Sequence, residues 1–99
     1  MFSVYILFSE EHDKYYVGQT DDLERRLLQH NELSENSFTS RYRPWVLALA
    51  IAVPDRTVAI KMERFIKKQK SKKYLREVIA SKERQHMLRQ RFIENYSAD

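Results

Sequence analysis

Five side chains in this sequence carry the chemistry that phosphate transfer requires: two phenols, a guanidinium, an imidazole and a carboxylate. They are Tyr5, Tyr16, Arg26, His30 and Glu63. Arginine can bind a phosphate through two parallel hydrogen bonds, and histidine titrates near neutral pH. Phosphodiester hydrolysis needs a base to activate water, a cation to stabilise charge on the phosphate, and often a carboxylate to hold a divalent metal. Together the five residues match that inventory, although each one alone has an ordinary packing or surface role.

The two tyrosines belong to a predicted β-hairpin over the first eighteen residues, in which two short apolar runs flank a polar SEEHD segment. With the loop centred between Glu10 and Glu11, Tyr5 is expected opposite Tyr16. Alternation then gives a core face with Phe2, Val4, Ile6, Phe8, Tyr15 and Val17. The other face carries Ser3, Tyr5, Leu7, Lys14, Tyr16 and Gly18, the only glycine in the chain.

Arg26 and His30 belong to a helix predicted over residues 22–31, where Asp21 and a glutamate three residues later resemble a capping box. Helical spacing places both residues near the stripe marked by Leu23, one turn apart. A charged arginine beside a buried face needs an anion, from the protein or from a ligand. Arg25 is expected to point outward to solvent.

Residues 32–43 form a polar stretch that ends with Arg41 and Arg43, and we expect a long functional or mobile loop there. Residues 45–53 alternate bulky and small apolar side chains without any charge, which predicts a third antiparallel strand. We expect both faces of this strand to be covered, with a helix close to its alanine face.

Glu63 falls in a helix predicted over residues 58–70 with Thr57 as its N-cap, at the border of the buried stripe. The simplest interpretation of Glu63 from spacing alone is an ion pair with Lys67, four residues on. Ser71 is expected to begin a further helix, and a last helix carries Leu88, Phe92 and Tyr96.

The predicted order β-β-α-β-α-α-α indicates an α+β fold, with a small three-stranded antiparallel β-sheet flanked by helices. The length favours a single domain over residues 1–99, with a core over about 2–80 and a helical extension over 81–99.

Charge is distributed unevenly. Residues 1–60 hold 6 basic and 9 acidic side chains, whereas residues 61–91 hold 12 basic and 3 acidic ones, a net charge of +9 for that segment. Such a segment favours a polyanionic partner, most often nucleic acid, although a solvated basic helix face and a site for an acidic protein remain open.

The chain has no cysteine, which excludes disulfides, thiol catalysis and cysteine-ligated zinc within these residues. Its longest apolar run, residues 45–53, is far shorter than the roughly 20 residues needed to cross a bilayer. We therefore expect a soluble cytoplasmic protein without a membrane partner.

Several motifs together resemble the GIY-YIG nuclease family, in particular its small stand-alone members related to the excinuclease subunit UvrC. They are Ser3-Val4-Tyr5, Tyr16-Val17-Gly18, the segment LERRLLQHN, Phe38-Thr39, Pro44-Trp45 and the segment MERFIKKQKSKKYL. The resemblance covers residues 2–80.

The resemblance implies a role for each matching position. Tyr5 and Tyr16 match the tyrosines of the two triplets, one of which acts as or helps the general base, and Gly18 leaves room beside the substrate. Arg26 matches the arginine that contacts the scissile phosphate, and His30 matches a histidine near the attacking water. Glu63 matches the glutamate that holds a single Mg²⁺ or Mn²⁺.

The sequence also departs from the family pattern. Ser3 and Val4 replace the glycine and isoleucine of the first triplet, and Gln19 stands where some members carry a lysine. No asparagine matches the late phosphate-contacting one, so Lys67, Lys68 or Lys70 is expected to contact phosphate, with further contacts from Arg41 and Arg43. We expect a metal-dependent endonuclease acting on DNA, more than on RNA, in repair or recombination. The alternative is a nucleic-acid-binding module of the same fold with little or no catalysis.

Overall fold

The computed structural model describes residues 1–33 and 37–94. The elements in chain order are β1 (Phe2–Ser9), β2 (Lys14–Thr20), α1 (Leu23–Leu28), the π-helical turn η1 (Gln29–Leu33), α2 (Phe38–Arg41), β3 (Val46–Val53), α3 (Arg56–Lys68), α4 (Lys72–Ala80), α5 (Lys82–Arg89) and the π-helical turn η2 (Gln90–Glu94). The three strands form one antiparallel sheet in the order β2-β1-β3. The predicted α+β fold is confirmed. Within the described residues, no helix is long and apolar enough to cross a membrane.

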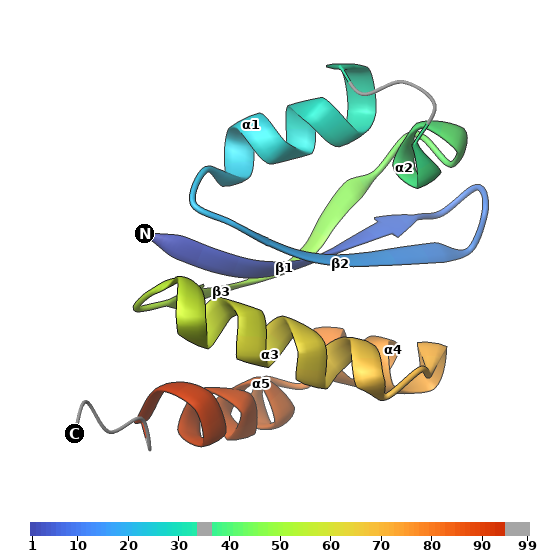
Figure 1. Ribbon diagram of the computed structural model, residues 1–99. Coiled ribbons are helices and arrows are strands. Elements are labelled where there is room, and N and C mark those ends of the chain that lie inside the picture. The colour runs from blue at the N-terminus through green and yellow to red at the C-terminus, as the bar shows by residue number, and fades with distance from the viewer. Residues whose placement is uncertain (34–36, 95–99) are drawn as a thin grey trace.

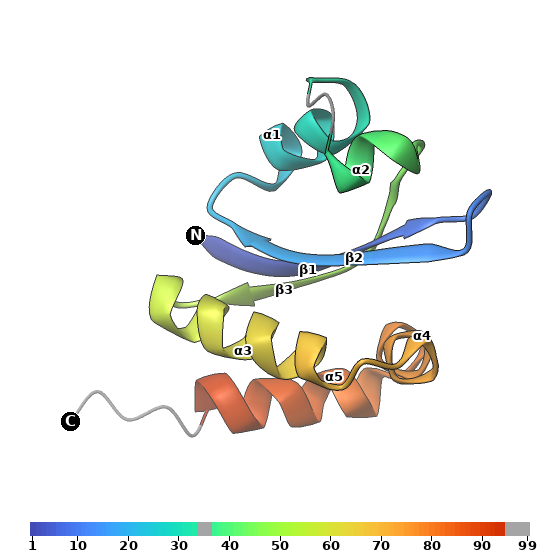
Figure 2. The ribbon, with the colours of Figure 1, turned by 45° about the vertical axis from the view of Figure 1, so that its right-hand side comes forward.

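The sheet separates two groups of helices (Figures 1 and 2). Helices α1 and α2 lie on one side, and α3, α4 and α5 lie on the other, with α5 beyond α3. The larger core lies between the sheet and α3, where buried side chains of β1 and β3 meet Val58, Met62 and Ile66. Leu88 of α5 is buried in the same core, so the C-terminal helices complete the apolar interior.

The hairpin has the predicted faces but a different register. Tyr5 pairs with Gly18 and Leu7 pairs with Tyr16, because the connection spans residues 10–13 and its centre lies one residue later than expected. The register differs from the prediction by two positions, so no side chain changes face. The face of Tyr5 is also a core face: Tyr5, Leu7 and Trp45 form a second, smaller buried cluster.

The third strand departs from the prediction. A bulge between the pairs Ile6–Leu49 and Leu7–Leu47 interrupts its alternation. Ile51 therefore joins the larger core, whereas Trp45 joins the smaller core on the opposite side of the sheet. The expectation that both faces are covered is wrong, because Val46 and Leu47 are 57% and 40% exposed. The alanines do not face α3, which packs on the bulky face.

Two helix starts and one predicted loop also differ from expectation. Asp22 caps α1 by accepting a hydrogen bond from the backbone N–H of Arg25, so the cap lies one residue after Asp21. Asp55, and not Thr57, caps α3 by accepting from Val58 at 2.9 Å. The predicted 32–43 loop contains the short helix α2, which Ser37 starts through a capping box. Ser71 caps α4 as predicted, and Tyr96 lies outside the described residues.

Candidate active site

Tyr5 and His30 form the buried centre of the site. The Tyr5 hydroxyl lies 2.9 Å from Nε2 of His30, and the two residues are 1% and 4% exposed. Tyr5 is on the central strand, and His30 is in η1, directly after α1 on the same side of the sheet. The His30 ring also contacts Tyr16, with ring centroids 4.6 Å apart. The helix and hairpin motifs therefore meet, as the sequence predicted.

Gly18 makes room for the Tyr5 ring. It is paired with Tyr5 across the hairpin, and a Cβ at this position would lie 2.5 Å from the Tyr5 hydroxyl oxygen and 2.7 Å from Cζ. The same Cβ would lie 3.1 Å from Tyr16 Cε1. Only glycine lets the phenol cross this strand toward His30.

Arg26 lies on α1 close to both phenol oxygens. Burial lowers the pKa of Arg26, but hydrogen bonding and charge interactions with Tyr5 and Tyr16 outweigh that effect, and its pKa is raised overall. Its Nη1 donates a hydrogen bond to Oε1 of Gln29 at 3.0 Å. The guanidinium is thus held at the phenols and stays charged, which suits it to bind a phosphate.

The protonation states of the central pair follow from burial. Desolvation raises the pKa of Tyr5 to about 12, with the charges of Tyr16 and Glu63 adding to the rise and Arg26 opposing it. Desolvation, together with the positive charges of Arg26 and Arg43, lowers the pKa of His30 to about 4. At neutral pH the phenol keeps its proton and the imidazole is neutral, so the pair shares one hydrogen bond without any net charge.

Glu63 lies on α3, on the other side of the sheet from α1. Its side chain is 18% exposed, and its Oε1 forms an ion pair with Nζ of Lys67 at 2.8 Å. The ion pair expected from spacing is therefore present. The charge of the carboxylate nevertheless adds to the rise of the Tyr5 pKa, so Glu63 is coupled electrostatically to the phenol cluster.

The residues of the site can be examined for their ability to bind a divalent metal ion. Among the described residues, no group of three or more histidine, aspartate or glutamate side chains could hold a metal ion by itself. Mg²⁺ commonly uses one or two carboxylates and completes its shell with water and substrate phosphate oxygens. Glu63 alone fits this mode of binding, provided that the cation displaces Lys67.

Each of two surface hollows has one residue of the cluster in its lining. One, of about 270 Å³, is lined by Tyr16, Lys67 and Lys70 together with residues of β2, α3 and α4. The other, of about 460 Å³, is lined by Arg25, Arg26 and Gln29 and by the turn before α1. Tyr16 is partly exposed, whereas Tyr5 is not. Tyr16 and Arg26 are therefore the members of the cluster that solvent and a ligand can reach.

The remaining residues predicted to bind substrate lie in different environments. Lys70 and Lys67 line the hollow beside Tyr16, while Lys68 is exposed and does not line it. Arg41 is exposed at the end of α2. Arg43 donates from Nε to the carbonyl oxygen of His30 at 2.6 Å and from Nη2 to that of Gln29 at 3.3 Å.

Two positioning residues were not recognised from sequence. Arg43 holds the backbone of η1, as described above. Asn31 bonds both backbone groups of Trp45, donating to its oxygen at 2.9 Å and accepting from its nitrogen at 2.7 Å. These bonds attach η1 to the start of β3 and so fix the height of His30 above the sheet. A lone asparagine at a helix end has no spacing signal that would reveal this role.

Comparison with known proteins gives a family match. Residues 1–75 match the model of the GIY-YIG catalytic domain. A protein of Meyerozyma guilliermondii named structure-specific endonuclease subunit SLX1 is 35% identical over 80 residues, covering 75% of this chain and 27% of the relative. The protein of the same name from Chaetomium globosum is 41% identical over 69 residues, covering 64% of this chain and 21% of the relative.

A third protein of that name, from Cryptococcus neoformans, is 36% identical over 67 residues, covering 65% of this chain and 14% of the relative. The chain therefore spans about a quarter or less of the length of the curated relatives that it matches.

Proposed function

The chain belongs to the GIY-YIG catalytic-domain family, and on that premise we propose that it is an endonuclease that hydrolyses phosphodiester bonds in DNA. One observation carries the proposal: two phenols, an arginine and a neutral histidine form a single cluster, and the charge of Glu63 reaches it. The relatives are named structure-specific endonuclease subunits, which supports a substrate selected by its structure. We propose branched DNA, in a repair or recombination role.

We assign the reacting phenol to Tyr16. Tyr5 is buried and bonded to His30, so it positions the imidazole. Tyr16 contacts the same imidazole and lines a hollow with Lys67 and Lys70. Tyr16 is partly exposed and lies beside Arg26, so a water bound there is proposed to give its proton to the Tyr16 oxygen as the phosphorus is attacked.

His30 is proposed to accept the proton of the Tyr16 hydroxyl while Tyr16 takes the proton of the water. Its pKa is low because of burial and because the charges of Arg26 and Arg43 oppose a positive imidazole. A phosphate bound to Arg26 offsets one of these charges, so substrate binding raises the basicity of His30 where it is needed. Arg26 then stabilises the extra negative charge of the transition state.

Glu63 is the residue proposed to hold Mg²⁺ or Mn²⁺. A divalent cation supplies charge stabilisation for phosphate and leaving-group oxygens. We propose that the DNA backbone is contacted by Lys67, Lys68 and Lys70, since they belong to the 61–91 segment with its net charge of +9. Arg41, exposed at the end of α2, is proposed as a further contact. Arg43 acts instead through the carbonyl oxygens that it holds in η1.

Cleavage assays test this proposal. The purified chain should cut flap or fork DNA in the presence of Mg²⁺ or Mn²⁺, and the plasmid and single-stranded forms measure its preference. Salt-dependent DNA binding without cleavage on any of these substrates would instead identify the alternative, a binding module of the same fold.

A further inference from the structure

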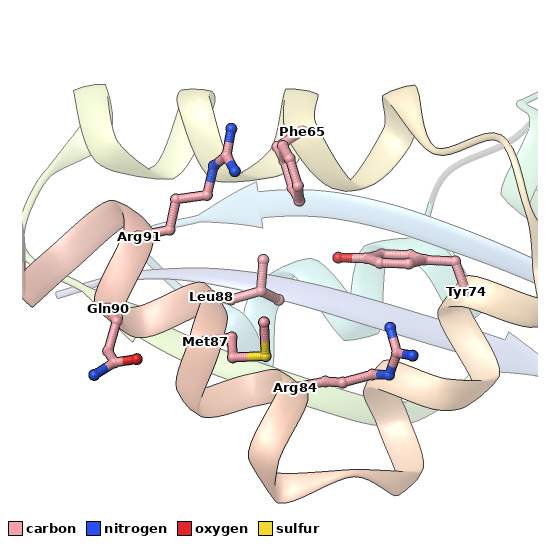
Figure 3. A pocket seen from close by; sticks show the side chains of 7 residues that line it. All are labelled: Phe65, Tyr74, Arg84, Met87, Leu88, Gln90 and Arg91. Carbon is pink, nitrogen blue, oxygen red and sulfur yellow. The ribbon is translucent and has the colours of Figure 1, made fainter.

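A cavity of about 420 Å³ is lined by residues of α3, α4, α5 and η2. Its lining residues are Phe65, Tyr74, Arg84, Met87, Leu88, Gln90 and Arg91. None of them lines the hollows beside Tyr16 and Arg26. Figure 3 shows Leu88 and the Tyr74 ring pointing into the space between the helices, while Gln90 points away from it.

The walls of the cavity are apolar and partly open. Phe65, Tyr74 and Leu88 form its inner surface, and Met87 at its mouth is 59% exposed. Methionine adapts its shape to different apolar partners, and Met, Tyr, Phe and Arg are enriched at the centres of protein interfaces. The volume lies in the usual range for a binding pocket and exceeds that of a single large side chain.

Two arginines bring positive charge to this apolar surface. Cζ of Arg91 lies 4.4 Å from the centroid of the Phe65 ring. Nη2 of Arg84 forms an ion pair with Oε2 of Glu77 at 3.0 Å. Burial raises the pKa of Tyr74, and the charges of Arg84 and Arg91 oppose that rise, so both guanidinium groups act on the hydroxyl that points into the cavity. Among the described residues, Arg91 has no carboxylate partner.

The aromatic rings favour a peptide over a nucleic-acid base. Base stacking needs an open ring face. One face of the Phe65 ring is covered by the guanidinium of Arg91. The same ring also packs against the Phe92 ring, with centroids 5.4 Å apart. Met87 is the most exposed apolar side chain of the lining, whereas Phe65 and Tyr74 are only partly exposed. A flexible thioether beside two guanidinium groups complements an apolar side chain flanked by carboxylates.

We propose that this cavity is a docking site for an acidic peptide segment of a partner protein. One large apolar side chain of the partner fills the space against Tyr74, Met87 and Leu88, and neighbouring carboxylates pair with Arg84 and Arg91. A carboxylate paired at the edge of an apolar cavity is poorly screened, so each pair strengthens the docking. The site lies outside the catalytic cluster and does not depend on its activity.

A fluorescence anisotropy titration tests the docking site with the full chain. The probe is a labelled synthetic peptide of aspartates and glutamates around a central leucine-phenylalanine pair. We expect saturable binding that weakens at least about tenfold in Met87→Asp and in Arg91→Gln. Arg76→Gln removes an exposed charge from α4 outside the cavity, and should change the affinity less than about twofold.

Two peptide controls separate docking from simple charge attraction. Replacing the leucine-phenylalanine pair by serines, or the acids by their amides, should each abolish the Met87-dependent binding. Cleavage by Met87→Asp should match the wild type. The proposal is overturned if the serine peptide binds as well as the probe, or if Met87→Asp has no effect on binding. It is also overturned if a thymidine oligomer shows the Met87 dependence instead, or if Met87→Asp converts a dimer into a monomer.

Discussion

The hydroxyl of Tyr5 crosses directly over Gly18 on the neighbouring strand, so that a Cβ at residue 18 would lie only 2.5 Å from its oxygen. The pairing of Tyr5 with Gly18 and the 2.9 Å contact with His30 fix the phenol on both sides. The glycine therefore sets the position of the imidazole as well as that of the ring.

Gly18→Ala should destabilise the protein and reduce cleavage together. The added methyl must displace a ring that is 1% exposed, and overpacking of this kind costs about 1–3 kcal/mol. Urea unfolding and single-turnover cleavage measure the two effects. Gly18→Ala in a Tyr5→Phe background should recover little stability, because Cζ still lies 2.7 Å from the new methyl. A variant as stable and as active as the wild type would refute this role of Gly18.

Stability should fall as the pH drops from about 6.5 toward 4 because of His30. Its pKa is lowered from 6.5 to about 4 in the folded chain, so over this range the unfolded chain binds a proton that the folded one does not. The slope is at most about 1.4 kcal/mol per pH unit, since one proton is involved. Urea midpoints across this range should lose most of the slope in His30→Gln. The control is His86→Gln, which replaces an exposed histidine on α5; an equal effect of both changes would be evidence against the assignment.

Arg26→Lys should lower the cleavage rate about 100-fold or more, because lysine cannot bind a phosphate through two parallel hydrogen bonds. Arg25→Lys is the matched control, since the neighbouring arginine on the same helix is exposed. Its rate should stay within about threefold of the wild type. Single-turnover rates and DNA affinities of both variants check the prediction, and equal losses would exclude a specific role for Arg26.

Lys67→Met should tighten the binding of Mn²⁺ a few-fold, because the cation no longer competes with the 2.8 Å ion pair of Glu63. Partly exposed ion pairs contribute up to about 1 kcal/mol, which sets this scale. Mn²⁺ affinity measured by paramagnetic resonance should rise in Lys67→Met and be lost in Glu63→Gln. Undiminished Mn²⁺ binding by Glu63→Gln would place the metal elsewhere.

The sequence predicted the residues that meet at the site because period-two and helical spacing decide which side chains share a face. Tyr5 and Tyr16 were assigned to the correct face of the hairpin although its register differed by two positions. Arg26 and His30 were placed one turn apart beside the stripe of Leu23 and Leu27. The structure packs that stripe, partly buried, against the smaller core, although His30 lies in η1 just after α1. Glu63 needed the family resemblance, because spacing alone explains its ion pair with Lys67.

What the sequence did not predict depends on contacts between distant segments. The bulge in β3 transfers Trp45 to the smaller core, and no local residue pattern marks that bulge. Asn31 and Arg43 support η1 through hydrogen bonds to backbone groups thirteen and fourteen residues away. Such side-chain to backbone bonds carry no periodicity, so only the folded chain reveals them.

The comparison of Tyr16→Phe with Tyr15→Phe tests the central claim most directly. The two tyrosines are adjacent on β2, but Tyr16 contacts His30, whereas Tyr15 packs against Phe8 on the other face. Single-turnover cleavage of flap or fork DNA with Mn²⁺ should fall about 100-fold or more in Tyr16→Phe. Tyr15→Phe should keep nearly the wild-type rate, and both variants should bind the DNA as the wild type does. Full cleavage by Tyr16→Phe, or equal losses in the two variants, would contradict the assignment of Tyr16 as the reacting phenol.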